Sequence, residues 1–423
     1  MVLYYALGLF ALTYILLLAL PNHRAWVALL SAAVFVVSGM LPYQKVFGAI
    51  DWNVLMMIAG TMGLVSLFIE SGMPALMADL LLDRTKNVRA TIIALSLFAG
   101  VVSAFVDNVA TVLMIAPVGL AIAKRLGISP VPLLITISVS SNLQGAATLV
   151  GDTTSILLGS YAGMDFMDFL FMDGRPSIFW AVELGAAATV PVIMLLFRRE
   201  RGSVPRTPPT EVEDMFPTWL LLGNILLLIG VSFIPGKPAV TNGLICLAVF
   251  LIGAVRSLVR NRNASSVKTA VRDIDYETLL LLTGLFVVIR GVVRVGLIDD
   301  ASQIFVRLGG GNLFLLYTLI VWFSVLISAF IDNIPYVATM LPVVSALAAS
   351  QGCSPYVLYF GLLVGATLGG NLTPIGASAN IAAIGILRKN GWEVKTGDFM
   401  RIGVPFTLIA VLVGYLYCWL VWA

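Results

Sequence analysis

Ser103-Ala104-Phe105-Val106-Asp107-Asn108 recurs further along the chain as Ser328-Ala329-Phe330-Ile331-Asp332-Asn333, at a separation of 225 residues. The same separation relates a second group of small and polar residues, since Gly145, Thr148 and Gly151 match Gly370, Thr373 and Gly376. A register shared over so many positions indicates an internal repeat. The chain is therefore predicted to consist of two related halves, each carrying one copy of the hexapeptide.

The composition identifies the solvent in which these halves fold. Of the 423 residues, 60% are hydrophobic and only 11% are charged, whereas soluble domains carry roughly 25% charged residues. Because a span needs about 20 mostly apolar residues, the chain has room for about a dozen such segments. We expect one integral membrane domain in contact with the lipid bilayer, and the composition gives no support for nucleic-acid binding.

Apolar runs follow one another along the whole chain, and four of them are too long for one simple span. The runs 90–123 and 312–349 are interrupted by Asp-Asn, which predicts hairpins that enter and leave on the same side. The runs 131–162 and 355–387 are interrupted by Gly-rich polar stretches, which predicts helices that are unwound within the membrane. The remaining runs are 3–20, 26–41, 52–70, 178–197, 217–234, 239–256, 276–292 and 402–421.

The distribution of Lys and Arg supports this topology. With ten crossing segments and two hairpins, 19 of the 25 basic residues lie in loops on one side and 6 on the other. Basic residues are enriched in cytoplasmic loops, so both termini are predicted on the outer side of the cell (inner or plasma) membrane. The hairpins then enter from opposite faces.

This topology predicts an all-α membrane protein with two inverted-topology repeats. The first repeat is expected at 1–200, a cytoplasmic linker at 201–216, and the second repeat at 217–423. Inverted repeats with discontinuous helices are typical of secondary transporters, whose binding sites lie near the middle of the membrane. The two hairpin tips and the two unwound helices are therefore the candidate site.

Asp107, Asp152 and Asp332 fall in these breaks. A charged side chain deep in a membrane costs a few kcal/mol, so its retention indicates a function. Helix capping is the alternative for Asp107 and Asp332, although Ser, Thr or Asn could cap without the charge. We favour a coupling role for these two acids, each of which precedes an Asn. Capping weighs more for Asp152, because Ala377 stands at its register in the second half.

The Gly-rich breaks supply backbone carbonyls, hydroxyls and amides. Such groups coordinate Na⁺ or hydrogen-bond a polar solute, and helix N-termini favour negative charge. Close packing of helices is the alternative explanation for single glycines. The candidate binding residues from the tips and the breaks, besides the three acids, are Asn108, Asn142, Thr148, Gly151, Thr153, Asn333, Thr373, Gly376, Ser378 and Asn380.

The phrase from Ser328 to Pro335 and the phrase from Gly369 to Asn380 resemble the ion transporter superfamily, specifically its arsenite permease and P protein (melanosomal permease) branch. The Asp-Asn tips are also similar to those of NhaD-type sodium/proton antiporters. Divalent anion/sodium symporters are more distant relatives, with Ser-Asn-Thr at the tips. The resemblance implies an elevator-type transporter, usually a homodimer. It also implies Na⁺ or proton sites around Ser103, Asn108 and Gly151, and around Ser328, Asn333 and Gly376.

Three carboxylates with no basic residue at the breaks suit proton- or cation-coupled movement of a neutral solute or a metal cation. An arsenite or antimonite efflux permease fits best. The alternatives left open are a sodium/proton antiporter, a sodium-coupled di- or tricarboxylate (citrate-like) transporter and a gated ion channel. No enzyme is expected because no pair of nucleophile and base is visible. The only cofactor expected is the coupling ion, and the resemblance leaves an associated ATPase subunit open.

Overall fold

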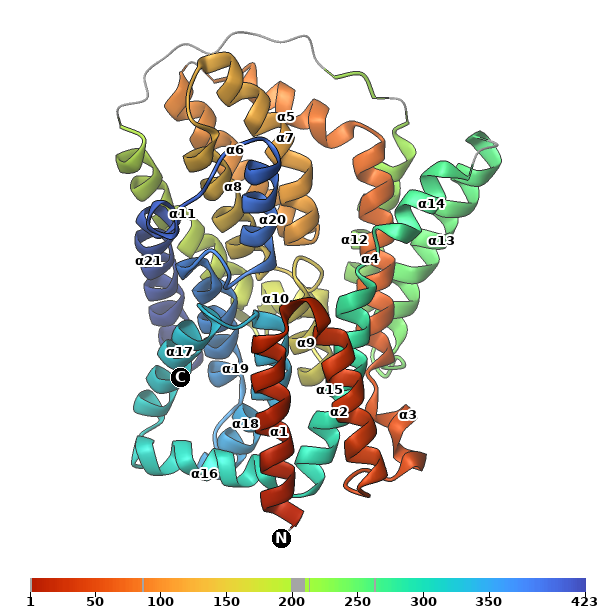
Figure 1. Ribbon diagram of the computed structural model, residues 1–423, viewed down its shortest axis with the longest axis vertical. Coiled ribbons are helices and arrows are strands. Elements are labelled where there is room, and N and C mark those ends of the chain that lie inside the picture. The colour runs from red at the N-terminus through yellow and green to blue at the C-terminus, as the bar shows by residue number, and fades with distance from the viewer. Residues whose placement is uncertain (1, 86, 199–209, 213, 262–263) are drawn as a thin grey trace.

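The computed structural model describes residues 2–85, 87–198, 210–212, 214–261 and 264–423, which form a bundle of helices (Figure 1). The linker predicted at 201–216 lies largely outside these residues. The helices of the first half are α1 (Val2–Ala19), α2 (Arg24–Val37), α3 (Val46–Ala49), α4 (Trp52–Glu70), α5 (Met73–Leu82), α6 (Val88–Ser103), α7 (Asn108–Leu126), α8 (Pro130–Gly145), α9 (Thr153–Ala162), α10 (Phe166–Leu170) and α11 (Ile178–Leu196).

The second half has a closely related series of elements. Its helices are α12 (Phe216–Ser232), α13 (Thr241–Asn261), α14 (Ser265–Arg272), α15 (Tyr276–Arg294), α16 (Leu297–Gly309), α17 (Leu313–Ser328), α18 (Asn333–Gln351), α19 (Tyr356–Leu363), α20 (Ser378–Lys389) and α21 (Thr396–Trp422). The short strands β1 (Phe171–Met172) and β2 (Arg175–Pro176) form an antiparallel pair between α10 and α11.

Seven helices of the described chain are long and apolar enough to cross a membrane, or eight if the bent pair of α16 and α17 is one span. Others, among them α6 and α12, are apolar but shorter. The ten crossings predicted from the sequence include two segments that the structure divides into shorter helices. The multi-pass class is thus supported by the structure, and the number of crossings stays a prediction.

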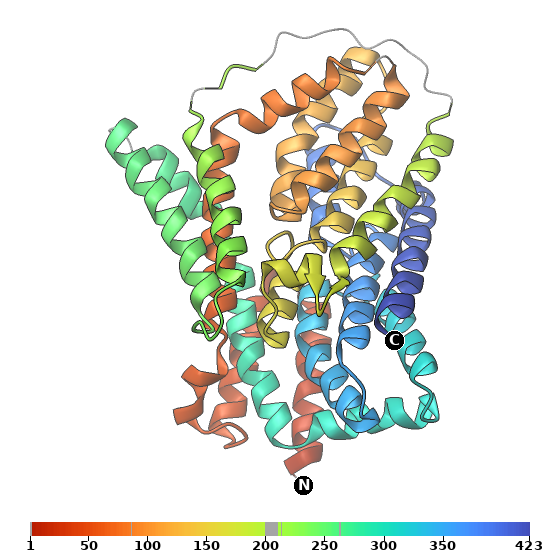
Figure 2. The ribbon, with the colours of Figure 1, turned by 180° about the vertical axis from the view of Figure 1, so that it is seen from behind.

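Two helical hairpins turn at the repeated hexapeptides. The first hairpin joins α6 to α7 and the second joins α17 to α18, and each turn occupies the residues between the Ser and the Asn of the motif. They approach the centre of the molecule from its two ends (Figures 1 and 2). This placement agrees with the hairpins expected from the sequence.

The two Gly-rich stretches interrupt helices as expected. In the first half α8 ends at Gly145 and α9 begins at Thr153. In the second half a π-helical turn (Val364–Leu368) and a 3-10 turn (Gly370–Leu372) follow α19, and α20 begins at Ser378. A π-helical turn inside a helix is frequent at functional sites.

Glycines allow two pairs of long helices to pack closely. A β-carbon on Gly60 of α4 would lie 2.4 Å from the backbone of Cys246 on α13, and one on Gly284 of α15 would lie 2.5 Å from the backbone of Ala28 on α2. Small residues permit such close approach between membrane helices. The pairs α4–α13 and α2–α15 therefore match each other, and each joins one helix of the first half to one helix of the second.

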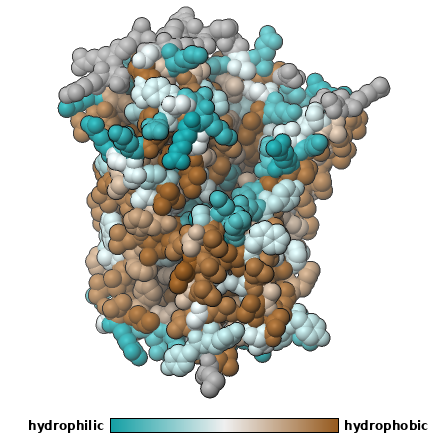
Figure 3. Space-filling model, viewed as in Figure 1, coloured by the Kyte–Doolittle hydropathy of each residue, from teal (hydrophilic) through white to brown (hydrophobic). Residues whose placement is uncertain are grey.

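The outer surface agrees with a protein in lipid. The face seen in Figure 3 is mostly hydrophobic over its middle and lower parts, and hydrophilic residues gather towards the top. Large apolar side chains are exposed on the molecule, among them Leu226, Leu420 and Val259. An apolar surface of this extent is not stable in water.

We predict that Gly60→Ala and Gly284→Ala each destabilise the protein by about 1–3 kcal/mol, because backbone atoms block the added methyl group. Gly223→Ala in α12 is the matched control, since nothing lies within 4 Å of its added methyl group. The measurement is the thermal unfolding midpoint of the purified protein in detergent. Equal midpoints for all three variants would contradict this account of the packing.

Candidate functional site

A cavity of about 390 Å³ lies where the two tips and the two interrupted helices meet α4 and α15. Residues from both halves line it, so neither half could form it alone. The lining residues are Ile58, Met62, Val65, Ser66, Ile69, Asp107, Asn108, Val109, Ala110, Leu113, Asp152, Thr153, Asp273, Asp275, Thr278, Asn333, Ile334 and Ser378.

The first tip presents Asp107 and Asn108 to this cavity. The Asp107 carboxylate caps α7, where it accepts hydrogen bonds from the amides of Val109 and Ala110 at 3.0 Å each. The buried Asn108 amide donates to Oδ1 of Asn142 at 2.9 Å and to Oδ1 of Asp152 at 3.4 Å. The tip is thereby joined to the interrupted helix of its own half.

Asp152 is buried, with 4% of its surface exposed, and its side chain makes no capping hydrogen bond to α9. The capping alternative that the sequence left open for this residue is therefore not seen in the structure. Its carboxylate instead accepts from the Thr154 hydroxyl at 2.7 Å and from Asn108. Thr154 Oγ1 also lies 2.9 Å from the Thr367 hydroxyl of the second half. Asp152 thus belongs to a polar network at the centre of the molecule.

Amide side chains continue this network across the two halves. Asn142 donates to the Thr367 carbonyl at 2.8 Å and to Oδ1 of Asn371 at 3.1 Å. Asn371 in turn donates to the Val139 carbonyl at 3.0 Å and accepts from Asn380 at 3.2 Å. Thr367 lies within the π-helical turn. Buried polar groups need such partners, because an unsatisfied group is costly in a low-dielectric interior.

The second tip differs from the first in its charge environment. Asp332 caps α18 by accepting from the Ile334 amide at 3.1 Å, and its other carboxylate oxygen lies 3.0 Å from Nη1 of Arg24. Ser378 donates to the same oxygen at 3.4 Å. Asp332 is not among the residues that line the cavity, although its neighbours Asn333 and Ser378 are. The carboxylate of Asp332 thus turns towards Arg24, whereas Asp107 and Asp152 line the cavity.

Backbone carbonyls converge on one glycine in each interrupted helix. A β-carbon on Gly151 would lie 2.5 Å from the Gly145 oxygen and 2.7 Å from the oxygens of Ser103 and Ala104. The second half repeats this arrangement at Gly376, where the oxygens of Gly370, Ser328 and Ala329 lie 2.5, 2.6 and 2.9 Å away. Only glycine fits at either position. Each arrangement packs three carbonyl oxygens of a tip and a break closely against the glycine.

Hydroxyl groups fasten each break to its tip. Thr148 donates to the Ala104 carbonyl, and Thr373 donates to the Ala329 carbonyl in the corresponding contact of the second half. Ser328 donates to the Ala366 carbonyl at 2.5 Å. Its counterpart Ser103 is fully buried, and its hydroxyl has no hydrogen-bond partner within the described part of the chain. The Ser103 hydroxyl of the first tip is therefore free to bind another group, close to the carbonyls that pack against Gly151.

Most residues proposed from the sequence are thus brought together, and the structure adds others. The sequence analysis did not propose Asp273, Asp275, Ser66, Thr367 or Arg24. Asp275 carried a usable signal, since it opens a span as Asp51 does at a separation of 224 residues. Thr367 lies inside an apolar run and Arg24 in a short loop, so their contacts depend on the three-dimensional fold.

The cavity is strongly acidic. Asp107, Asp152, Asp273 and Asp275 line it, and no Lys, Arg or His is among its lining residues in the described chain. Asp273 accepts a hydrogen bond from Ser66 at 2.6 Å, and Asp275 caps α15 by accepting from the Thr278 amide at 3.0 Å. The acids surround the cavity without converging, since no group of three metal-ligating side chains was found among the described residues. The cavity therefore favours cations or neutral solutes over bare anions.

A larger cavity, of about 750 Å³, lies elsewhere and contains none of the predicted site residues. It opens between the start of α8, the end of α11 and the segment around Trp392. Arg198 and Arg401 line it together with Glu393 and Asp398, so its charges balance. The smaller cavity remains the candidate site because it collects the tips, the breaks and the buried acids.

Comparison with known proteins places this geometry among transporters. The model of a family described as citrate transporter (CitMHS) matches residues 14–365. A 46 kDa membrane protein of Mycobacterium leprae is 34% identical, and the alignment covers 98% of each chain. The human P protein is 26% identical over 97% of this chain and 59% of its own length.

Two solved transporter structures share the fold. The YdaH transporter of Alcanivorax borkumensis superposes with a TM-score of 0.62 at 16% identity, covering 93% of this chain and 96% of YdaH. MtrF of Neisseria gonorrhoeae, titled an antimetabolite efflux pump, superposes with a TM-score of 0.58 at 15% identity, covering 92% of this chain and 84% of MtrF. The predicted resemblance to P proteins is confirmed, whereas nothing in these comparisons tests the likeness to arsenite permeases or NhaD-type antiporters.

We predict that Gly151→Ala and Gly376→Ala each distort the contact between a tip and its break, because the added methyl group would overlap three carbonyl oxygens. Gly385→Ala in α20 is the matched control, since it lies in the same segment and nothing lies within 4 Å of its added methyl group. Limited proteolysis and thermal unfolding in detergent should show weakened tips only in the first two variants. Unchanged proteolysis of both would contradict the assigned packing.

Proposed function

The chain belongs to the citrate transporter family, and on this premise we propose that it is a secondary active transporter coupled to protons or cations. Its site is the cavity between the two tips, and Asp107 and Asp152 are its central acids. The observation that supports this proposal best is the cavity lined, among the residues that the structure describes, by four carboxylates and no basic side chain. A transporter that moves a charged solute through such a site needs cations to offset the charge.

The electrostatics restrict the cargo. A di- or tricarboxylate that entered alone would lie near like charges in a medium where two charges 4 Å apart interact with about 4 kcal/mol at an effective dielectric constant of 20. A carboxylate accompanied by protons or metal cations would avoid this repulsion. We therefore propose a citrate-like carboxylate with its charge offset as the first candidate cargo.

Arsenite is the second candidate, as an efflux substrate. Arsenous acid is neutral near physiological pH, so the acidic cavity would not repel it. No cysteine lines the cavity, and Cys246 and Cys418 are buried elsewhere in the fold. Thiolate coordination of arsenic is therefore not part of this proposal. A sodium/proton antiporter and a gated channel remain the further alternatives.

The coupling ions are proposed to bind at the two carbonyl clusters beside the tips. Na⁺ accepts backbone carbonyls and hydroxyls as ligands, and unwound helices of transporters provide them. The cluster at Gly151 offers the carbonyls of Ser103 and Ala104, together with the unpartnered Ser103 hydroxyl. Asn108 and Asn333 lie next to the respective clusters in sequence and line the cavity.

Movement of the site is proposed to follow an elevator mechanism. The tips and breaks would move as one unit against the helix pairs α4–α13 and α2–α15. The opposed entry of the two hairpins supports inverted repeats, here proposed as 1–200 and 217–423, with both termini outside. A homodimer and an ATPase subunit stay predictions about partners.

Flux measurements in reconstituted vesicles test the cargo. We predict uptake of labelled citrate that increases with an imposed proton or Na⁺ gradient and with a divalent cation. Arsenite and ²²Na⁺ are compared under the same gradients. Flux of arsenite without citrate flux would favour the second candidate, and gradient-independent flux of every solute would contradict secondary active transport.

We predict that Asp107→Asn reduces coupled flux at least tenfold while the protein stays folded, because Asn can still cap α7 but cannot carry the charge. Leu113→Ile, on the same wall of the cavity, is the control that leaves the charge unchanged. Thermal unfolding reports folding and vesicle flux reports coupling. Wild-type coupled flux in Asp107→Asn would remove Asp107 from the coupling machinery.

A further inference from the structure

Arg24 provides the only ion pair found at either tip in the described chain. Its guanidinium lies 3.0 Å from Asp332, and the two side chains are 21% and 10% exposed. Asp107, the corresponding acid of the first tip, has no such partner among the described residues. In this conformation the second copy of the motif therefore has a positive charge beside its acid, and the first copy does not.

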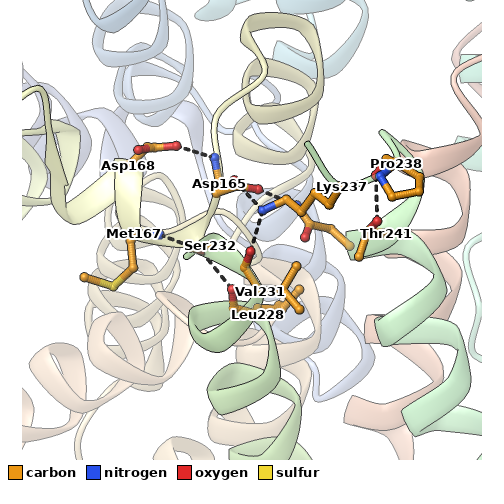
Figure 4. Close-up of polar contacts among 10 residues, drawn as sticks. Asp165, Met167, Asp168, Leu228, Val231, Ser232, Lys237, Pro238 and Thr241 are labelled. Atoms are coloured by element: carbon orange, nitrogen blue, oxygen red, sulfur yellow. Dashed lines mark hydrogen bonds and ion pairs between the residues drawn. The ribbon is translucent and has the colours of Figure 1, made fainter. Parts of the chain in front are cut away.

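The turn that carries Arg24 has a counterpart in the second half. Leu20-Pro21-Asn22-His23-Arg24-Ala25 joins α1 to α2, and Ile234-Pro235-Gly236-Lys237-Pro238-Ala239 joins α12 to α13. Each turn has a proline followed by a basic residue two or three positions later. Lys237 also makes an ion pair that bridges two parts of the fold, at 2.5 Å to Asp165 beside α10 (Figure 4).

The partners of the two basic residues differ in their relation to the site. Asp165 lies at the start of α10, where it also accepts from Asn242, and it does not line the cavity. Asp332 belongs to a tip, and it accepts a hydrogen bond from Ser378, which lines the cavity. The ion pair of Lys237 with Asp165 lies away from the site. A substitution of Lys237 therefore serves as a control for a substitution of Arg24.

We propose that Arg24 is a coupling residue, a tethered cation that holds Asp332 until the coupling cation displaces it. This inference deepens the proposed function and rests on it. In the present conformation the guanidinium neutralises Asp332, so a cation at the second tip has to compete with it. Asp107 is the acid left open to the cavity.

The contacts at Asp332 make the two cations mutually exclusive. One carboxylate oxygen accepts from the Ile334 amide, and the other lies beside both Arg24 and Ser378. A metal ion on the latter oxygen would lie within a few ångströms of the guanidinium, and Arg cannot relieve the repulsion by losing its proton. Release therefore requires the side chain to swing away.

The position of Arg24 permits this movement. It is the first residue of α2 and remains partly exposed. Within the described part of the chain its side chain makes one other hydrogen bond, a 3.4 Å contact from Nε to the Leu17 carbonyl. A partly exposed ion pair contributes modestly to stability, so a cation can displace it. Loss of the pair would also free the second tip from the turn between α1 and α2. Tyr14 of α1 would still contact the second hairpin, through the carbonyl of Pro335 at 2.8 Å and the hydroxyl of Thr339.

Binding of ²²Na⁺ to the purified protein at fixed pH tests the proposal. Arg24→Gln should bind ²²Na⁺ about fivefold more tightly than the wild type, because the competing charge is gone. Arg24→Lys should bind as the wild type does, and Asp332→Asn combined with Arg24→Gln should lose the gain. Lys237→Gln should leave the affinity unchanged, since Asp165 is outside the site.

Size-exclusion profiles establish that each variant is folded. Arg24→Met, which keeps the apolar part of the side chain, replaces Arg24→Gln if that variant aggregates. Equal ²²Na⁺ affinity in the wild type and both neutral variants would overturn the proposal, as would an equal gain in Lys237→Gln or no binding in any variant. Gradient-driven flux in the wild type would in those cases still support the proposed function, so the two failures are distinguishable.

Discussion

The interrupted helices leave backbone N–H and C=O groups that must find partners inside the protein. Lipid satisfies no N–H or C=O group, so an interrupted helix is stable only where protein or a polar cavity surrounds it. Thr148 and Thr373 meet this requirement by binding carbonyls of the tips. The glycines at 151 and 376 let further carbonyls of the tips and breaks approach closely. The close packing that satisfies the backbone therefore also holds each tip against its break.

The local architecture was predictable from the sequence because its causes are local. Asp107 and Asp332 each precede a helix and cap it, and the Gly-rich stretches end helices where the sequence indicated. Hydrophobicity and the repeated hexapeptide were sufficient to identify a membrane protein with two hairpins. The number of crossings is a different matter, since a short or broken apolar helix gives the same composition whether or not it spans the bilayer.

The candidate site was predictable only in part, because charge pairing depends on contacts between distant segments. Arg24 and Asp332 are 308 positions apart, and nothing in either local sequence indicates their contact. The same holds for the Asn142 contacts to Thr367 and Asn371. For Asp152 the sequence left both capping and a functional role open. Its partners in the structure are the Thr154 hydroxyl and the Asn108 amide, the latter from a different helix.

The two tips share a sequence motif but differ in their surroundings. Each half contributes one tip and one break, yet only Asp332 lies beside a basic side chain of the described chain. If both tips were neutralised by protein cations, the cavity would have little reason to attract an ion. If neither were, two tip acids and Asp152 would repel one another across the centre of the molecule. One paired tip and one open tip therefore reduce the repulsion while leaving an acid for the transported charge.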